Sequence, residues 1–358
     1  MTEPIKTNYY INKSMNKKRA LILFIVGIIL IGATTILHFY NKIYASNTTE
    51  EKTIFIYSNS DFESIISILT PILKNKNSFI WVAEKKNYPN VIKSGKYNIT
   101  LGMNNNDLVN LLRSGNQTPI KLSFNNQDSL EKLAGRIAQQ IEPDSLSILK
   151  AITENDFLVK NNFKPEMALA MYIPNSYQVY WNISAEKFRN KMLIEYQKFW
   201  SVAKIQKAKK QNLTIQQVTT LASIVQKETQ TIKERPKVAQ LYLNRLHNNW
   251  PLQADPTIIF TIKEQQGQDV VIKRVLLKDL KIKSKYNTYL NRGLPPGPIG
   301  MPDISSINAV LNPQNHNYYF MCVDIQNFGQ HLFAKTLAQH NKNAVKYQKW
   351  LNKQGINR

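Results

Sequence analysis

The chain has 358 residues, of which 43% are hydrophobic, so it can bury a real core, and we expect two folded units beyond any membrane anchor. Its formal net charge of +23 comes from basic residues scattered through every segment, which argues against nucleic acid and leaves attraction to an anionic wall or membrane surface as a secondary effect. The single cysteine excludes an internal disulfide, and no Gly-rich phosphate loop, CxxC pair or HExxH motif indicates nucleotide or zinc chemistry.

The N-terminal region carries the clearest physical signal. Ala20 to Leu37 is an uncharged, mainly apolar run, near the lower length limit for crossing a bilayer core of about 30 Å. Four basic residues precede this run and one follows it closely, so we predict a cytoplasmic tail over 1–19, a transmembrane helix over 20–40 and an extracytoplasmic remainder. A cleaved signal peptide is the alternative, although the run exceeds the usual length of about 7–15 residues.

The rest of the chain predicts an α+β protein with two parts. Residues 41–124 have the pattern of a small α/β module, with strands near 53–57 and 96–100, a helix from Ser60, and a second helix capped by Asn105 or Asn106 and closed by Gly115. Residues 125–358 form a larger mixed domain. Its aromatic loop at 172–177 suits either a sugar-stacking wall or ordinary packing, and its Pro- and Gly-rich loop at 286–299 either a groove wall or a plain turn.

One predicted helix carries a carboxylate on its apolar face. Leu221, Ile224, Val225 and Ile232 recur at helical spacing, and Glu228 falls on the same face, where a core residue belongs. Because burying a charge is costly, either a cation pairs with Glu228 or its carboxyl group keeps its proton near neutral pH. The first alternative is structural and the second is catalytic.

The next helix repeats this pattern. Glu234 precedes a helix start marked by a proline in the first turn, and Arg245 lies on or beside the apolar stripe that follows, to which Tyr242 belongs. A partly buried ion pair of Arg245 with Glu228 or with Glu234 is therefore the structural alternative. An aspartate followed by proline repeats the start signal further along, so Asp255 is either an N-cap or a functional carboxylate.

Four sequence blocks carry a family resemblance. In chain order they read ASIVQKET, ERPKVAQLYLNRL, PLQADPTIIF and YNTYLNRGLPPGPI. With these blocks, which are far longer than motifs that match by chance, the chain resembles the endolytic murein transglycosylases, membrane-anchored enzymes that cut peptidoglycan glycan strands. The resemblance implies a LysM-like wall-binding module at 41–124, with a packing spacer as the alternative, and a catalytic domain at 125–358. It also implies a single-pass plasma (inner) membrane protein with a periplasmic catalytic domain and peptidoglycan synthases as partners.

The resemblance assigns Glu228 as the catalytic glutamate. The first acidic position of the family's E-K-E block is Gln226 here, and helical spacing turns Gln226 about 200° from Glu228, so the two do not share a role. Further positions that we expect to bind substrate or support the site are Glu234, Asn244, Arg245, Gln253, Asp255, Thr257, Tyr286, Asn287 and Tyr289.

These enzymes need one carboxyl group, which acts first as acid toward the glycosidic oxygen and then as base toward the sugar's own 6-hydroxyl, giving a 1,6-anhydro ring. We therefore expect a lyase that cleaves between N-acetylmuramic acid and N-acetylglucosamine in nascent strands and terminates their elongation. Two alternatives stay open: a non-catalytic, membrane-tethered scaffold that binds peptidoglycan, and a wall hydrolase using Glu228 and Asp255. We expect no cofactor and no metal, since His316, His331 and His340 lack ligand-like spacing.

Overall fold

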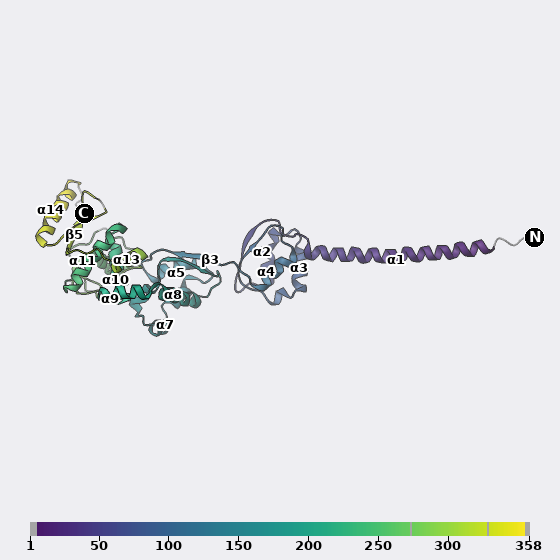
Figure 1. Cartoon of the computed structure of the whole chain (residues 1–358), viewed down its shortest axis with the longest axis horizontal. Coiled ribbons are helices and arrows are strands. Elements are labelled where there is room, and N and C mark those ends of the chain that lie inside the picture. The colour runs from purple at the N-terminus through teal and green to yellow at the C-terminus, as the bar shows by residue number, and fades with distance from the viewer. Residues whose placement is uncertain (1–5, 273, 328, 355–358) are drawn as a thin grey trace, which may run out of the picture. The chain divides into compact units, whose positions relative to one another are not determined.

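The computed structural model describes residues 6–272, 274–327 and 329–354 and has a mixed α+β fold with short two-stranded sheets (Figure 1). The predicted α+β class is confirmed. The chain divides into two compact units, one containing residues 1–120 with 180–182 and the other residues 121–179 with 183–358. Residues 1–5 of the predicted cytoplasmic tail, and 273, 328 and 355–358 of the predicted catalytic domain, lie outside the described residues.

The N-terminal unit is a long helix followed by a small two-stranded module. Its elements are α1 (Lys6–Tyr44), β1 (Lys52–Ile56), α2 (Phe62–Leu69), α3 (Lys76–Lys85), β2 (Gly95–Ile99) and α4 (Asn105–Ser114), with 3₁₀ turns at Thr70–Ile72 and Tyr88–Asn90. The strands pair antiparallel from Lys52 opposite Ile99 to Ile56 opposite Gly95. Apolar side chains from both strands and from α2, α3 and α4 form one core beneath this sheet.

The first helix carries the apolar run. Within α1, Lys17–Tyr44 contains an 18-residue window of mean hydropathy 2.8, and among the described residues it is the one helix long and apolar enough to cross a membrane. Its apolar side chains are exposed, which is typical of a surface that meets lipid and atypical of a core helix. The end of α1 packs on the module, where Phe39 stacks on Trp81 with ring centroids 5.3 Å apart.

Helix boundaries in the module differ slightly from those predicted. Asp61 caps α2 and Asn104 caps α4, each by accepting a hydrogen bond from a backbone N–H three residues on. The predicted cap at Ser60 is therefore one residue out, and the predicted caps at Asn105 or Asn106 are one or two residues out. Gly115 ends α4 with φ of 71°, as predicted, because a left-handed residue at this point favours glycine.

The second unit holds the remaining elements. These are β3 (Ile120–Phe124), α5 (Leu130–Ala138), α6 (Ser145–Ile152), α7 (Asn155–Lys160), β4 (Asn175–Val179), α8 (Ala185–Phe199), α9 (Val202–Lys210), α10 (Ile215–Glu228), α11 (Arg235–His247), α12 (Asp255–Gln266), α13 (Ile304–Leu311), β5 (Phe320–Val323), β6 (His331–Ala334) and α14 (Leu337–Lys353), with 3₁₀ turns at Pro165–Met171, Ile232–Glu234 and Asp279–Lys281. Strands β3 and β4 form one sheet, and β5 and β6 form another, which is antiparallel.

Three helices form the centre of this unit. Helices α10, α11 and α13 contact one another pairwise and lie together in Figure 1. A reciprocal capping box starts α10, because the Thr214 hydroxyl accepts from the Gln217 backbone and the Gln217 side chain accepts from the Thr214 backbone. Helix α11 starts at Arg235 with proline in its first turn, as the sequence predicts.

The two loops whose composition suits either a groove wall or ordinary packing make contacts within the protein. Tyr172 and Tyr177 are buried, and the Tyr177 hydroxyl donates to the Ile173 carbonyl at 2.5 Å, so packing and not sugar stacking explains these rings. In the second loop, a Cβ added at Gly297 would collide with the Glu166 carbonyl. This glycine therefore permits a close approach within the protein itself.

Candidate functional site

Glu228 lies at the C-terminal end of α10. The stripe that precedes it is fully buried, with Leu221, Ile224 and Val225 each at 0% exposure, while Glu228 itself is half-buried. The prediction that Ile232 continues this face is wrong, because α10 ends at Glu228 and Ile232 lies exposed in the 3₁₀ turn that follows. The helix therefore ends on a carboxyl group that follows the buried stripe and is itself partly exposed.

A neutral donor contacts this carboxyl group. The Tyr242 hydroxyl, from α11, donates to Glu228 Oε1 at 2.6 Å. Burial raises the pKa of Glu228 to about 7, although the Tyr242 hydrogen bond acts in the opposite direction. A carboxyl group with this pKa is protonated in a large fraction of molecules at neutral pH, as a general acid requires.

The predicted ion pairs of Arg245 are wrong. Arg245 donates through Nε to the Tyr319 carbonyl at 2.8 Å and through Nη1 to the Leu252 carbonyl, and within the described part of the chain no ion pair joins it to Glu228 or Glu234. Sequence spacing cannot reveal this, because both carbonyls come from segments outside α10 and α11. The guanidinium thus holds two backbone segments in place and does not bond to Glu228.

Glu234 has a different partner. It accepts the backbone N–H of His331 at 2.6 Å, and its other oxygen lies 2.9 Å from His331 Nδ1. These bonds and the His331 charge hold the pKa of Glu234 below its usual value despite the opposing effect of burial. Glu234, which directly precedes α11, therefore holds the start of β6 next to the start of that helix.

Asp255 is the second carboxylate near the site. It is exposed and is the first residue of α12. The N-cap position of this helix belongs to Ala254, so the N-cap interpretation of Asp255 is wrong. The Tyr289 hydroxyl donates to Asp255 Oδ1 at 2.6 Å. The negative charge of Asp255 adds to the rise of the Glu228 pKa.

Other predicted residues form a buried support. The hydroxyls of Thr257 and Thr288 are 2.9 Å apart, and the Asn287 side chain donates to the Leu280 and Ile282 carbonyls at 2.9 and 2.8 Å. Gln253 joins this support through its backbone, whose N–H donates to the Thr288 carbonyl. These contacts fix the loop that presents Tyr289 to Asp255.

Two predicted residues serve other contacts. Asn244 donates to the His316 and Tyr318 carbonyls at 2.8 and 3.0 Å, which ties α11 to the chain before β5. Tyr286 packs on Phe260 with ring centroids 4.6 Å apart. Neither contact involves the Glu228 carboxyl group.

Sequence reasoning missed Tyr242 and His331. Tyr242 is read as part of an apolar stripe, although a tyrosine there brings a hydroxyl that needs a partner when buried. For His331 the sequence indicates only that it lacks the spacing of a metal ligand. In the structure it bonds Glu234, and its charge also lowers the pKa of Glu228. The sequence holds no local signal that joins β6 to α10.

Gln226 points away from the site, as helical spacing predicts. Its side-chain oxygen accepts the Asp303 backbone N–H at 2.5 Å and the Ser306 hydroxyl at 3.2 Å. The amide therefore holds the start of α13, and its hydrogen bonds go to residues other than Glu228.

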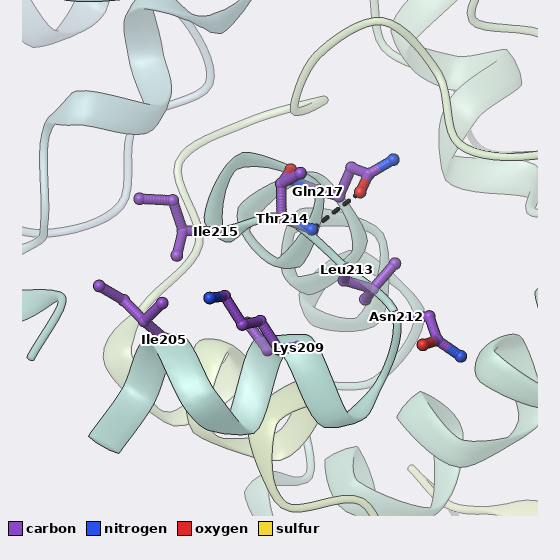
Figure 2. A pocket seen from close by; sticks show the side chains of 8 residues that line it. Ile205, Lys209, Asn212, Leu213, Thr214, Ile215 and Gln217 are labelled. Atoms are coloured by element: carbon purple, nitrogen blue, oxygen red, sulfur yellow. Dashed lines mark hydrogen bonds between the residues drawn. The ribbon is translucent and has the colours of Figure 1, made fainter. Parts of the chain in front are cut away.

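An apolar cavity of about 490 Å³ lies at the other end of α10. Figure 2 shows Ile205 and Lys209 of α9 on one side of it and Thr214 and Ile215, at the start of α10, on the other. The length of α10 places it roughly 20 Å from Glu228. It is therefore separate from the carboxylate site.

Among the described residues, no group of three or more His, Cys, Asp or Glu side chains could hold a metal ion.

A half-buried glutamate with a near-neutral pKa and a hydroxyl partner has the properties that a general acid needs. The chain belongs to the YceG-like family, whose sequence model matches residues 54–346. This confirms the resemblance that the four sequence blocks carry.

Three similar proteins extend this comparison. An endolytic murein transglycosylase of Bacillus subtilis (strain 168) is 27% identical over 312 residues, which cover 82% of this chain and 84% of that protein. One of Streptococcus pneumoniae (strain R6) is 25% identical over 334 residues, covering 84% of this chain but 59% of that relative. A crystal structure of a putative YceG-like protein from Listeria monocytogenes matches with a TM-score of 0.54 and 26% identity, covering 82% of this chain and 98% of that one.

Proposed function

We propose that the protein is an endolytic peptidoglycan lytic transglycosylase in which Glu228 is the catalytic residue. The observation that carries this proposal is a carboxyl group whose pKa is raised to about 7, contacted by the Tyr242 hydroxyl and by no cation among the described residues. The names of the bacterial relatives support the same reaction class.

The chemistry follows from one carboxyl group acting twice. Protonated Glu228 gives its proton to the glycosidic oxygen as the bond from C1 of N-acetylmuramic acid to the N-acetylglucosamine oxygen breaks. The resulting carboxylate takes the proton of the muramic acid 6-hydroxyl as that oxygen bonds to C1. The products are a 1,6-anhydro end and a free sugar hydroxyl, and Glu228 recovers its proton without water.

Asp255 has a supporting role in this scheme. Its exposed carboxylate accepts the Tyr289 hydroxyl, and its negative charge favours the protonated form of Glu228. A hydrolase would use such a second carboxylate to activate water. The product distinguishes the two reactions, because hydrolysis leaves a reducing end and transglycosylation leaves an anhydro end.

We also propose how the chain is arranged in the cell. Residues 1–19 are cytoplasmic, 20–40 cross the plasma membrane once, 41–124 form a LysM-like module that binds wall, and 125–358 form the extracytoplasmic catalytic domain. The exposed apolar surface of α1 supports the anchor. Such an enzyme meets strands as synthases release them at the membrane, so it would act on nascent glycan and end its elongation.

The test is digestion of purified peptidoglycan by the full chain. The wild type should release 1,6-anhydro-muropeptides, and Glu228→Gln, which keeps the side chain's shape, should lower the rate by at least about 100-fold, the usual contribution of a positioned acid. Wild-type products with free reducing ends would replace this proposal with the hydrolase. Sedimentation of both proteins with insoluble wall, without products from either, would indicate the scaffold.

A further inference from the structure

A cavity with two cations adjoins the carboxylate site. Its volume is about 600 Å³, and its lining includes Asp255 and Tyr289 together with the exposed side chains of Arg274 and Lys278. The rest of the lining is apolar and consists of Val275, Leu276, Leu277 and Leu280. The cavity therefore combines positive charge with aliphatic surface.

The charge in this cavity is not balanced. Asp255 is the one carboxylate in the lining, and the Tyr289 hydroxyl already donates to it at 2.6 Å. Neither Arg274 nor Lys278 forms an ion pair within 4 Å to any acid in the part of the chain that the structure describes. Two cations against one carboxylate leave a net positive lining, which attracts an anionic group.

The position of the cavity ties it to the reaction. Asp255 and Tyr289, which line the cavity, interact electrostatically with Glu228, so the cavity lies near that carboxyl group. In peptidoglycan each muramic acid can carry a stem peptide on its lactyl group, and that peptide bears free carboxylates and short alkyl side chains. A strand with its scissile bond at Glu228 brings one such peptide close to this lining.

We propose that this cavity binds the stem peptide of the muramic acid at the cleaved bond, with Arg274 and Lys278 contacting its carboxylates. The inference rests on the proposed function and adds to it that the protein prefers strands that carry peptides over stripped glycan. Uncharged sugar hydroxyls complement neither the two cations nor the apolar side chains of this lining. A peptide with carboxylates and alkyl side chains complements both.

The test compares two substrates made from one glycan preparation, with and without removal of the peptides by an amidase. The full chain is assayed on each for release of 1,6-anhydro ends, and kcat/KM for peptide-bearing strands is divided by that for stripped strands. Arg274→Ala with Lys278→Ala should lower this ratio about tenfold, since two exposed charge pairs are removed. High salt should lower the wild-type ratio too, by screening.

Matched variants make the result specific. The double variant Lys281→Ala with Lys283→Ala removes two exposed cations that do not line the cavity, so it should leave the kcat/KM ratio unchanged. The exchange Arg274→Lys with Lys278→Arg preserves both charges in the lining and should retain most of the wild-type ratio. An unchanged ratio in the double alanine variant overturns the stem-peptide proposal, while anhydro products that depend on Glu228 still support the enzyme. Absence of anhydro products from the wild type overturns both.

Discussion

Replacing Tyr242 with phenylalanine tests how the protein tunes its acid. The Tyr242 hydroxyl is buried and donates to Glu228 Oε1 at 2.6 Å. A donor at this distance favours the ionised carboxylate and lowers its pKa, whereas burial raises that pKa to about 7. In Tyr242→Phe the effect of burial is opposed only by the more distant charges of His331 and Arg245, so the pKa of Glu228 should rise further.

The size of the change follows from the bond that is lost. A hydrogen bond to a charged acceptor contributes roughly 1.5–3 kcal/mol, and about 1.4 kcal/mol corresponds to one pH unit. Glu228 must be protonated to act as acid, so the rate falls as pH rises through its pKa. The high-pH limb of the rate profile should therefore move upward by about one to two pH units.

The assay is the initial rate of anhydro-product release by the full chain between pH 5 and 10. Tyr196→Phe is the matched control, because the Tyr196 hydroxyl is also buried but has no hydrogen-bond partner among the described residues. The control should keep the wild-type profile. A high-pH limb in Tyr242→Phe that stays in place or moves to lower pH would refute the assignment of Glu228 as the titrating acid.

Two further predictions concern stability and are measured by thermal unfolding. Folding raises the pKa of Glu228 from 4.5 to about 7, so ionisation of this group destabilises the folded state as pH rises through this range, by at most roughly 3 kcal/mol and by less for a half-buried group. The stability of Glu228→Gln relative to the wild type should therefore increase between pH 5 and 8. A difference in stability that stays constant over this range would contradict the raised pKa. Gly297→Ala should lower the free energy of unfolding by about 1–3 kcal/mol, because the added Cβ collides with the Glu166 carbonyl. Gly135→Ala, where the added Cβ meets open space on α5, should be neutral or stabilising. Equal thermal midpoints for the two variants would contradict the collision.

Local patterns in the sequence predict the elements that carry the site. The apolar spacing of Leu221, Ile224 and Val225 identifies α10 and places Glu228 on its buried face, and a proline in the first turn correctly predicts the start of α11. These features depend on residues within two helical turns of one another. Sequence periodicity reports such contacts directly.

The contacts that decide the chemistry are long-range, and the sequence does not predict them. Arg245 bonds the carbonyl of Tyr319, which lies 74 residues away along the chain, and Glu234 bonds His331 across 97 residues. Opposite charges on neighbouring helices suggest direct pairing, but backbone groups compete for the same donors and must be satisfied when buried. The ion-pair interpretation failed because it considered side chains alone.

The engagement of these charges elsewhere explains why Glu228 can work as an acid. A carboxylate bonded to a guanidinium would have a lowered pKa and would be ionised at neutral pH. Here Arg245 is occupied by two carbonyls and His331 by Glu234, so the group that bonds Glu228 is the hydroxyl of Tyr242, which is uncharged. Burial then outweighs the remaining attractions and keeps the proton available. Any change that frees Arg245 to reach Glu228 should therefore reduce activity at neutral pH even if the fold is unchanged.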